Sequence, residues 1–289
     1  MIAKTQAQIF NSIENHQEYK STYPSMRGEG KNVGAAQEIH IFLAEINPTQ
    51  ERVQEYYSIV EKWNQLHPDL TYKMKPCYLA LVFRDSQGGE NTVCVMQSSR
   101  YVRSNDTDYV VEQSHEDANW FVSQGFSVIR EKIEAEAHGI EGIPLTDEEM
   151  NRYPSKYFEF HIKVGKVDKE DLSELTDEEI DQLKQISAKF TLKFGVPIPL
   201  SYNNNKDQHT GDKLGHQRFL NARFRNLGFN TVAPKIEAIK QAINDTGTFK
   251  VLKTISEYVW YDTFPALDHG WIDYSKEELE YLIKEMAGN

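Results

Sequence analysis

A strand-like segment carrying Glu-x-His occurs twice in the chain and constrains the fold more than any other feature. In EIHIFLAEI, apolar side chains alternate with Glu38, His40 and Phe42, and in YFEFHIKV they alternate with Glu159 and His161. Such alternation is typical of a β-strand with one face on a core. The two histidines are 121 residues apart (161 − 40), a spacing that suits a duplicated domain better than a solenoid.

The segments that follow each Glu-x-His strand come in the same order. In the first copy we predict a helix over 50–66, strands over 77–83 and 92–102, a helix over 115–125 and a strand over 126–137. In the second copy we predict a helix from 177, strands over 196–202 and 217–224, a helix with Pro234 in its first turn, and a strand over 249–262. This β-α-β-β-α-β order predicts an α+β protein of two fused ferredoxin-like repeats with antiparallel sheets and pseudo-twofold symmetry.

The predicted domain bounds follow from glycine- and proline-rich breaks between these elements. They are an N-terminal arm (1–36), a first repeat (37–138), a linker (139–156), a second repeat (157–262) and a C-terminal tail with a helix (263–289). The glycine cluster RGEGKNVGAA precedes a strand instead of following one, which favours a flexible linker over a phosphate loop. The polar segment 201–216 is interpreted as a solvated loop, with a substrate lid as the alternative.

The order of elements over about residues 38–262 resembles the tandem ferredoxin-like proteins, including the α+β barrels. The paired histidines also give a distant resemblance to the two-histidine phosphoesterases, whose motif is His-x-Thr or His-x-Ser. Here Phe42 and Lys163 occupy the hydroxyl position. The resemblance implies phosphoester hydrolysis by a pair of histidines in a cleft between the repeats.

In a ferredoxin-like repeat the helices cover one face of the sheet, so the polar side chains of each first strand should project from the other face. When the two copies are aligned by their elements, Arg100 corresponds to Arg223, Ser98 to Asn221, and Glu134 to Glu257. Each uncovered face is therefore expected to present Glu, His, Arg and Glu.

The leading hypothesis is an enzyme acting on a small phosphorylated or nucleotide-like substrate, with His40 and His161 transferring protons. The expected ligand-binding residues are Glu38, Arg100, Glu134, Glu159, Arg223 and Glu257. The alternative is a non-catalytic ligand-binding or protein-interaction protein. A third reading is a metal-dependent enzyme with Glu and His ligands for Zn²⁺, Fe²⁺ or Mn²⁺. A fourth is structural, because Glu–Arg pairs across strands are common in sheets.

Composition limits the partners. The net charge of −12, from 32 basic and 44 acidic residues, argues against general binding to nucleic-acid backbones. No apolar run is long enough for a membrane span, and the first residues lack the apolar stretch of a signal peptide. With only Cys77 and Cys94, a cytoplasmic protein is expected. The sequence indicates no particular cofactor, and a monomer is compatible with it.

Overall fold

The computed structural model describes residues 36–84, 90–137, 142–167, 175–202 and 218–264. The arm, most of the 201–216 loop and the tail helix predicted above lie outside these residues. Within them the predicted fold class is confirmed: the element order β-α-β-β-α-β occurs twice.

The described residues divide into two compact units, with β8 shared between them. The first unit reaches Ile143 and takes up Tyr258 onward, and the second spans Pro144–Glu257. Unit 1 contains β1 (Ala36–Ile46), α2 (Gln50–Leu66), β2 (Lys75–Arg84), β3 (Glu90–Arg103), α3 (Thr107–Ser123) and β4 (Val128–Glu136). Unit 2 contains α4 (Asp147–Met150), β5 (Tyr157–Lys166), α5 (Asp177–Phe194), β6 (Leu200–Tyr202), β7 (Arg218–Arg225), α6 (Phe229–Asn244) and most of β8 (Phe249–Asp262).

The strand order is the same in both repeats when each is read from its outer edge. It is β2-β3-β1-β4 in the first repeat, with the end of β8 added beside β4, and β6-β7-β5-β8 in the second. In both, the order is second, third, first and fourth strand of the repeat. Strand β1 pairs antiparallel with both β3 and β4, and β5 pairs antiparallel with β7. The first strand of each repeat therefore lies inside its sheet, where its side chains have neighbours on both sides.

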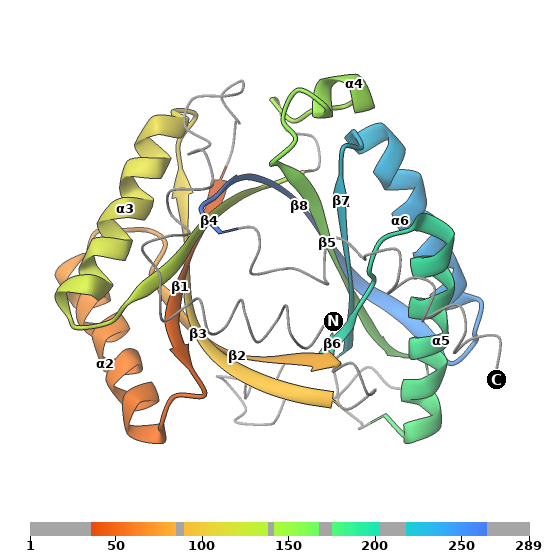
Figure 1. Cartoon of the computed structure of the whole chain (residues 1–289), viewed down its shortest axis with the longest axis horizontal. Coiled ribbons are helices and arrows are strands. Elements are labelled where there is room, and N and C mark those ends of the chain that lie inside the picture. The colour runs from red at the N-terminus through yellow and green to blue at the C-terminus, as the bar shows by residue number, and fades with distance from the viewer. Residues whose placement is uncertain (1–35, 85–89, 138–141, 168–174, 203–217, 265–289) are drawn as a thin grey trace. The chain divides into compact units, whose positions relative to one another are not determined.

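In each unit two helices cover one face of the sheet: α2 and α3 in unit 1, and α5 and α6 in unit 2 (Figure 1). The apolar side chains of β1 and β5 form a core under these helices. In unit 1 this core includes Ile39, Ile41, Val60, Phe121 and Ile133. In unit 2 it includes Phe160, Ile162, Leu183, Phe190, Ile236 and Ile239. We call the opposite side of each sheet its polar face, and the Glu-x-His side chains lie there.

Two helices begin earlier than their sequences suggested. Helix α3 starts at Thr107, where the Asp106 carboxylate accepts hydrogen bonds from the backbone N–H groups of Asp108 and Tyr109. Helix α6 starts at Phe229, so the prediction that Pro234 lies in its first turn is wrong. The cause is tertiary: the N–H groups of Gly228, Phe229 and Asn230 bond to the segment 144–147, which fixes the helix start upstream of the proline.

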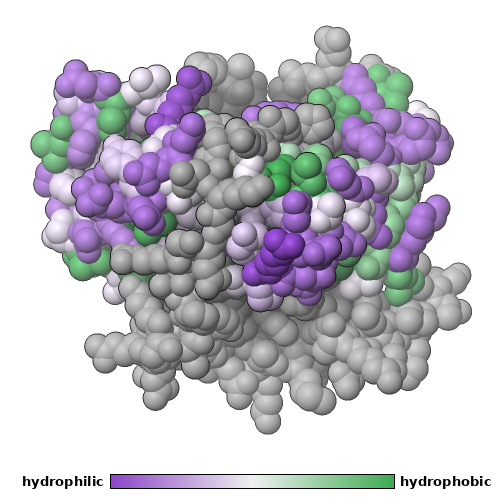
Figure 2. Space-filling view, turned by 90° about the horizontal axis from the view of Figure 1, so that it is seen from above, coloured by the Kyte–Doolittle hydropathy of each residue, from purple (hydrophilic) through white to green (hydrophobic). Residues whose placement is uncertain are grey.

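The described surface seen in Figure 2 is mainly hydrophilic, with hydrophobic side chains in small groups. Exposed apolar side chains such as Leu66 and Val122 are ordinary on such a surface. Among the described helices, none has the length and apolar character needed to span a bilayer.

Candidate functional site

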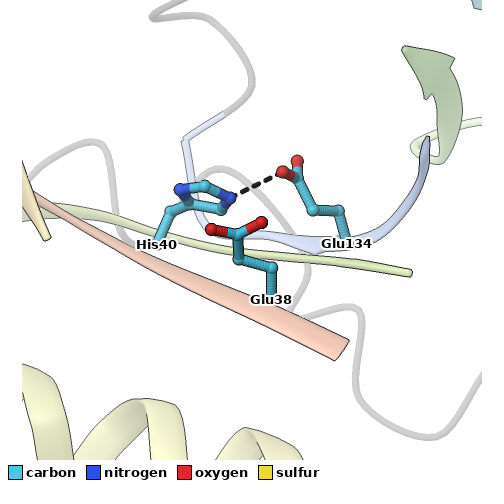
Figure 3. A group of neighbouring side chains, drawn as sticks. All are labelled: Glu38, His40 and Glu134. Atoms are coloured by element: carbon cyan, nitrogen blue, oxygen red, sulfur yellow. Dashed lines mark hydrogen bonds and ion pairs between the residues drawn. The ribbon is translucent and has the colours of Figure 1, made fainter. Parts of the chain in front are cut away.

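The polar face of unit 1 brings together Glu38 and His40 from β1 and Glu134 from β4. Glu38 lies opposite Glu134 in the β1–β4 register, and residues i and i+2 of a strand project to the same side. Figure 3 shows the two carboxylates turned toward the imidazole, with all three side chains on the side of the sheet away from the helix. The three residues therefore share one face, as the alternation of their strands predicts.

His40 and Glu134 are in direct contact. The Nε2 atom of His40 lies 2.6 Å from Oε1 of Glu134. The other carboxylate oxygen, Oε2, lies 2.6 Å from Nζ of Lys132, the residue opposite His40 on β4. His40 is 8% exposed and Glu134 3%, so these charges are largely withdrawn from water. Glu134 therefore bridges the imidazole and the ammonium group.

The second nitrogen of His40 contacts Gln97 on β3. The side-chain amide of Gln97 hydrogen-bonds to Nδ1, and the backbone carbonyl of Gln97 accepts from the Tyr56 hydroxyl at 2.5 Å. The amide nitrogen donates when the ring is neutral, and the amide oxygen accepts when Nδ1 is protonated, so Nε2 carries a proton that faces Glu134 in either state. These contacts fix the ring plane of His40 and connect it to helix α2.

The electrostatics of the pair favour its charged form. Burial alone would lower the pKa of His40, but the Glu134 carboxylate outweighs burial and raises that pKa above its usual 6.5. Burial would likewise raise the pKa of Glu134, yet His40 and Lys132 hold it well below its usual range. Glu134 is thus a carboxylate at neutral pH, the form in which it could ligate a metal ion.

Unit 2 carries a related cluster around His161. The Nδ1 group of His161 donates to Oδ1 of Asn221 at 2.6 Å, and Nε2 lies 3.3 Å from a carboxylate oxygen of both Glu159 and Glu257. Arg223 Nη2 donates to Glu159. Burial lowers the pKa of His161, but the two carboxylates and Asn221 outweigh it and raise the pKa to about 9. His161 is therefore an imidazolium ion at neutral pH.

The predicted position of Arg100 beside His40 is wrong. Arg100 lies opposite Ile39 in the β1–β3 register, which puts its side chain on the helix-covered face. There Nε donates to Oδ2 of Asp117 on α3 at 2.5 Å, and the guanidinium lies over the Trp63 ring. Arg100 therefore joins β3 to α2 and α3 and takes no part in the polar face.

The error is a register slip of one residue. His161 is opposite Asn221 and Glu159 is opposite Arg223, whereas His40 is opposite Ser99 and Glu38 is opposite Tyr101. The structural counterpart of Arg223 is thus Tyr101, and that of Asn221 is Ser99 instead of Ser98. Because side chains alternate along a strand, a shift by one residue moves every side chain to the other face.

Two residues of the unit 1 cluster were missed by sequence reasoning: Lys132 and Gln97. Lys132 is two residues before Glu134 on β4, so the alternation of the predicted strand could have placed it on the same face. Gln97 could not have been found in this way, because its position opposite Phe42 depends on the pairing register of β1 with β3, which no local pattern in the sequence reveals.

The three ligand atoms of Glu38, His40 and Glu134 lie within 4.8 Å of one another, close enough to hold one metal ion after small side-chain movements. Donors bound to one Zn²⁺ at about 2.0–2.2 Å lie roughly 3 Å or more apart, so the His40–Glu134 contact would open slightly as the ion replaces the shared proton. Among the described residues, no other group of three His, Cys, Asp or Glu side chains brings its ligand atoms this close together.

The fold and these clusters define the protein as an α+β protein of two ferredoxin-like repeats, each with a partly buried Glu-x-His cluster. No known family model matches the sequence, and no curated protein sequence matches it. Among solved structures, the chain is similar to a structure described as a novel heme-binding protein from Thermus thermophilus. The identity is 11% and the TM-score 0.26, with coverage of 89% of this chain and 100% of the other. A likeness at this level carries no inference about ligands.

Proposed function

We propose that this protein is a ligand-binding protein whose ligand is a divalent metal ion held by Glu38, His40 and Glu134. The observation that supports the proposal is the convergence of three ligand atoms within 4.8 Å on one face of the sheet, where His40 and Glu134 are buried and Glu38 is half-buried. One imidazole and two carboxylates suit borderline ions such as Zn²⁺, Fe²⁺ and Mn²⁺.

The contacts around the cluster are those of an oriented ligand set. The side chain of Gln97 contacts the far nitrogen of His40. A metal ion at Nε2 would leave the ring proton on Nδ1, where the amide oxygen of Gln97 can accept it once the amide group is turned. Glu134 is ionised at neutral pH because its pKa is held low by His40 and Lys132 against the opposing effect of burial. The ammonium of Lys132 opposes a cation, so the ion has to compete both with it and with the His40 proton.

Phosphoester hydrolysis by His40 and His161 is the finer function expected from the sequence, and we do not adopt it. That reading gave the phosphate oxygens to Arg100, which lies on the opposite face. The cation that does lie near His40, Lys132, is in contact with Glu134. The guanidinium of Arg223 is engaged by Glu159. The cleft between the repeats and the cytoplasmic location stay predictions.

The experiment is a metal titration of the full-length protein by calorimetry, with Zn²⁺ and Mn²⁺ after treatment with a chelator. We expect one ion per chain at the unit 1 site, and a loss of affinity of more than about a hundredfold in both Glu38→Gln and His40→Ala. Because the ion displaces a proton, its affinity should also fall as the pH is lowered.

The matched control is His161→Ala, which removes the equivalent histidine of the second repeat. This variant should keep the unit 1 affinity. Absence of saturable binding by the unaltered protein, together with no change in its melting temperature on adding either ion, contradicts the proposal. Equal losses in His40→Ala and His161→Ala contradict its assignment to unit 1.

A further inference from the structure

A metal ion at the proposed site has more coordination positions than the three side chains of the protein can fill. Glu38, His40 and Glu134 supply three donor atoms, and a metal ion with three protein ligands keeps at least one coordination position for another molecule. What occupies that position depends on the groups around it.

Lys132 is the group placed to meet such a molecule. Its side chain lies on the same face, opposite His40 in the β1–β4 register, with Nζ 2.6 Å from Oε2 of Glu134. Because the ion would replace the proton between His40 and the other oxygen of the same carboxylate, it would lie within roughly 5 Å of Nζ. A ligand spanning the ion and the ammonium therefore needs only two or three atoms.

The change of charge on metal binding favours an anion. The ion brings two positive charges and displaces at most one proton, from His40, so the charge of the cluster rises by at least one. Lys132 is 6% exposed and His40 8%, and an uncompensated charge in such a place is strongly unfavourable. A bound anion removes that excess where it arises.

We propose that the metal-loaded site binds a small oxyanion, a carboxylate or inorganic phosphate, as its second ligand. One oxygen of the anion ligates the ion, and another accepts a hydrogen bond from Nζ of Lys132. This inference rests on the proposed metal site and specifies what that site binds.

The test compares Zn²⁺ affinity in acetate, in phosphate and in weakly coordinating perchlorate, at equal ionic strength and pH. Affinity is read from competition with a chromophoric chelator, corrected for complexes of Zn²⁺ with the anions themselves. In the unaltered protein we expect affinity to be about tenfold tighter in acetate or phosphate than in perchlorate, because linked ligands strengthen each other reciprocally. An effect of acetate alone or phosphate alone identifies which oxyanion is bound.

The variant Lys132→Met removes the ammonium and should abolish the anion effect, with Zn²⁺ bound more tightly than by the unaltered protein in perchlorate. Lys132→Arg keeps the charge and should keep the effect, and it replaces the methionine variant as the test if that variant does not fold. Equal Zn²⁺ affinity in all three salts overturns the oxyanion inference and leaves the metal site intact. No Zn²⁺ binding in any salt overturns the metal proposal itself.

Discussion

At the scale of single residues, each repeat combines a histidine with two carboxylates and one permanent cation, but the cation comes from a different strand. In unit 1 it is Lys132 on β4, which contacts Glu134. In unit 2 it is Arg223 on β7, which contacts Glu159. Tyr101 fills the position that corresponds to Arg223. The charge composition of the cluster is thus the same in both copies although its geometry differs.

The raised pKa of His161 predicts that stability depends on pH. The pKa of His161 is raised from 6.5 to about 9, since the carboxylates of Glu159 and Glu257 outweigh burial. A raised pKa stabilises the folded state fully below the unfolded value and loses that contribution as the pH passes the folded value. We expect the free energy of unfolding to fall by about 2–3 kcal/mol between pH 6.5 and 9.5.

Urea denaturation across this range measures the effect. His161→Gln should remove most of the decline and should be less stable than the unaltered protein at pH 6.5. If the variant and the unaltered protein lose stability in parallel between pH 6.5 and 9.5, His161 is not the group responsible.

At the scale of residues, the face on which a side chain lies could be predicted for β1 and β5, but the cross-strand neighbours could not. The alternation in β1 and β5 was sufficient to place Glu38, His40, Glu159 and His161 on polar faces. It could not place Arg100, because a cross-strand neighbour depends on the pairing register, which no local pattern in β3 reveals. The Asp117 partner of Arg100 comes from α3, and only the folded structure brings the two together.

At the scale of elements, the start of helix α6 depends on contacts that are distant in sequence. Local capping residues explain the start of α5, where Thr176 and Glu179 form a capping box. Helix α6 has no side-chain cap of its own at Gly228. Its N-terminus instead lies against the backbone of Leu145 and Thr146, so close that a Cβ atom at position 228 would be 2.3 Å from the Thr146 carbonyl carbon.

This close approach predicts that Gly228→Ala is strongly destabilising although the φ of −74° suits any residue. We expect a loss of about 2–4 kcal/mol, because the new methyl group must push the backbone of Thr146 away from α6. The comparison is Gly195→Ala at the end of α5, where φ is +68° and nothing lies within 4 Å of the added atom. That change should cost only about 1 kcal/mol.

Chemical denaturation of the two variants gives the order directly. A Gly195→Ala variant less stable than Gly228→Ala would show that backbone conformation, and not close approach, governs the two positions.

At the scale of the whole molecule, β8 belongs to both units. Its end returns to unit 1, where Asp262 accepts two hydrogen bonds from Arg130 of β4, at 2.9 and 2.5 Å. The two residues are 132 positions apart, and Arg130 is 1% exposed. The order of elements allowed the fold class to be predicted from sequence, but this sharing of one strand was not visible in it.

Asp262→Ala is therefore expected to destabilise the protein by about 3 kcal/mol or more, since it removes the carboxylate facing a buried guanidinium. The control is Glu237→Ala, which breaks the exposed Lys240–Glu237 pair on α6 and should change stability by less than about 0.5 kcal/mol. Thermal unfolding of both variants distinguishes them, and equal melting temperatures would contradict the role given to Asp262.

The shared strand also bears on how the chain is made. Unit 1 receives its last strand from residues that follow Pro144–Glu257 of unit 2, so a nascent chain cannot complete unit 1 until that part of unit 2 has been synthesised. At about 5–20 residues per second, translation of Pro144–Glu257 takes roughly 6–23 s. Throughout that interval β4 presents an unpaired edge, to which a neighbouring nascent chain can add a strand. Early chaperone contact with the first repeat would protect that edge until Asp262 emerges.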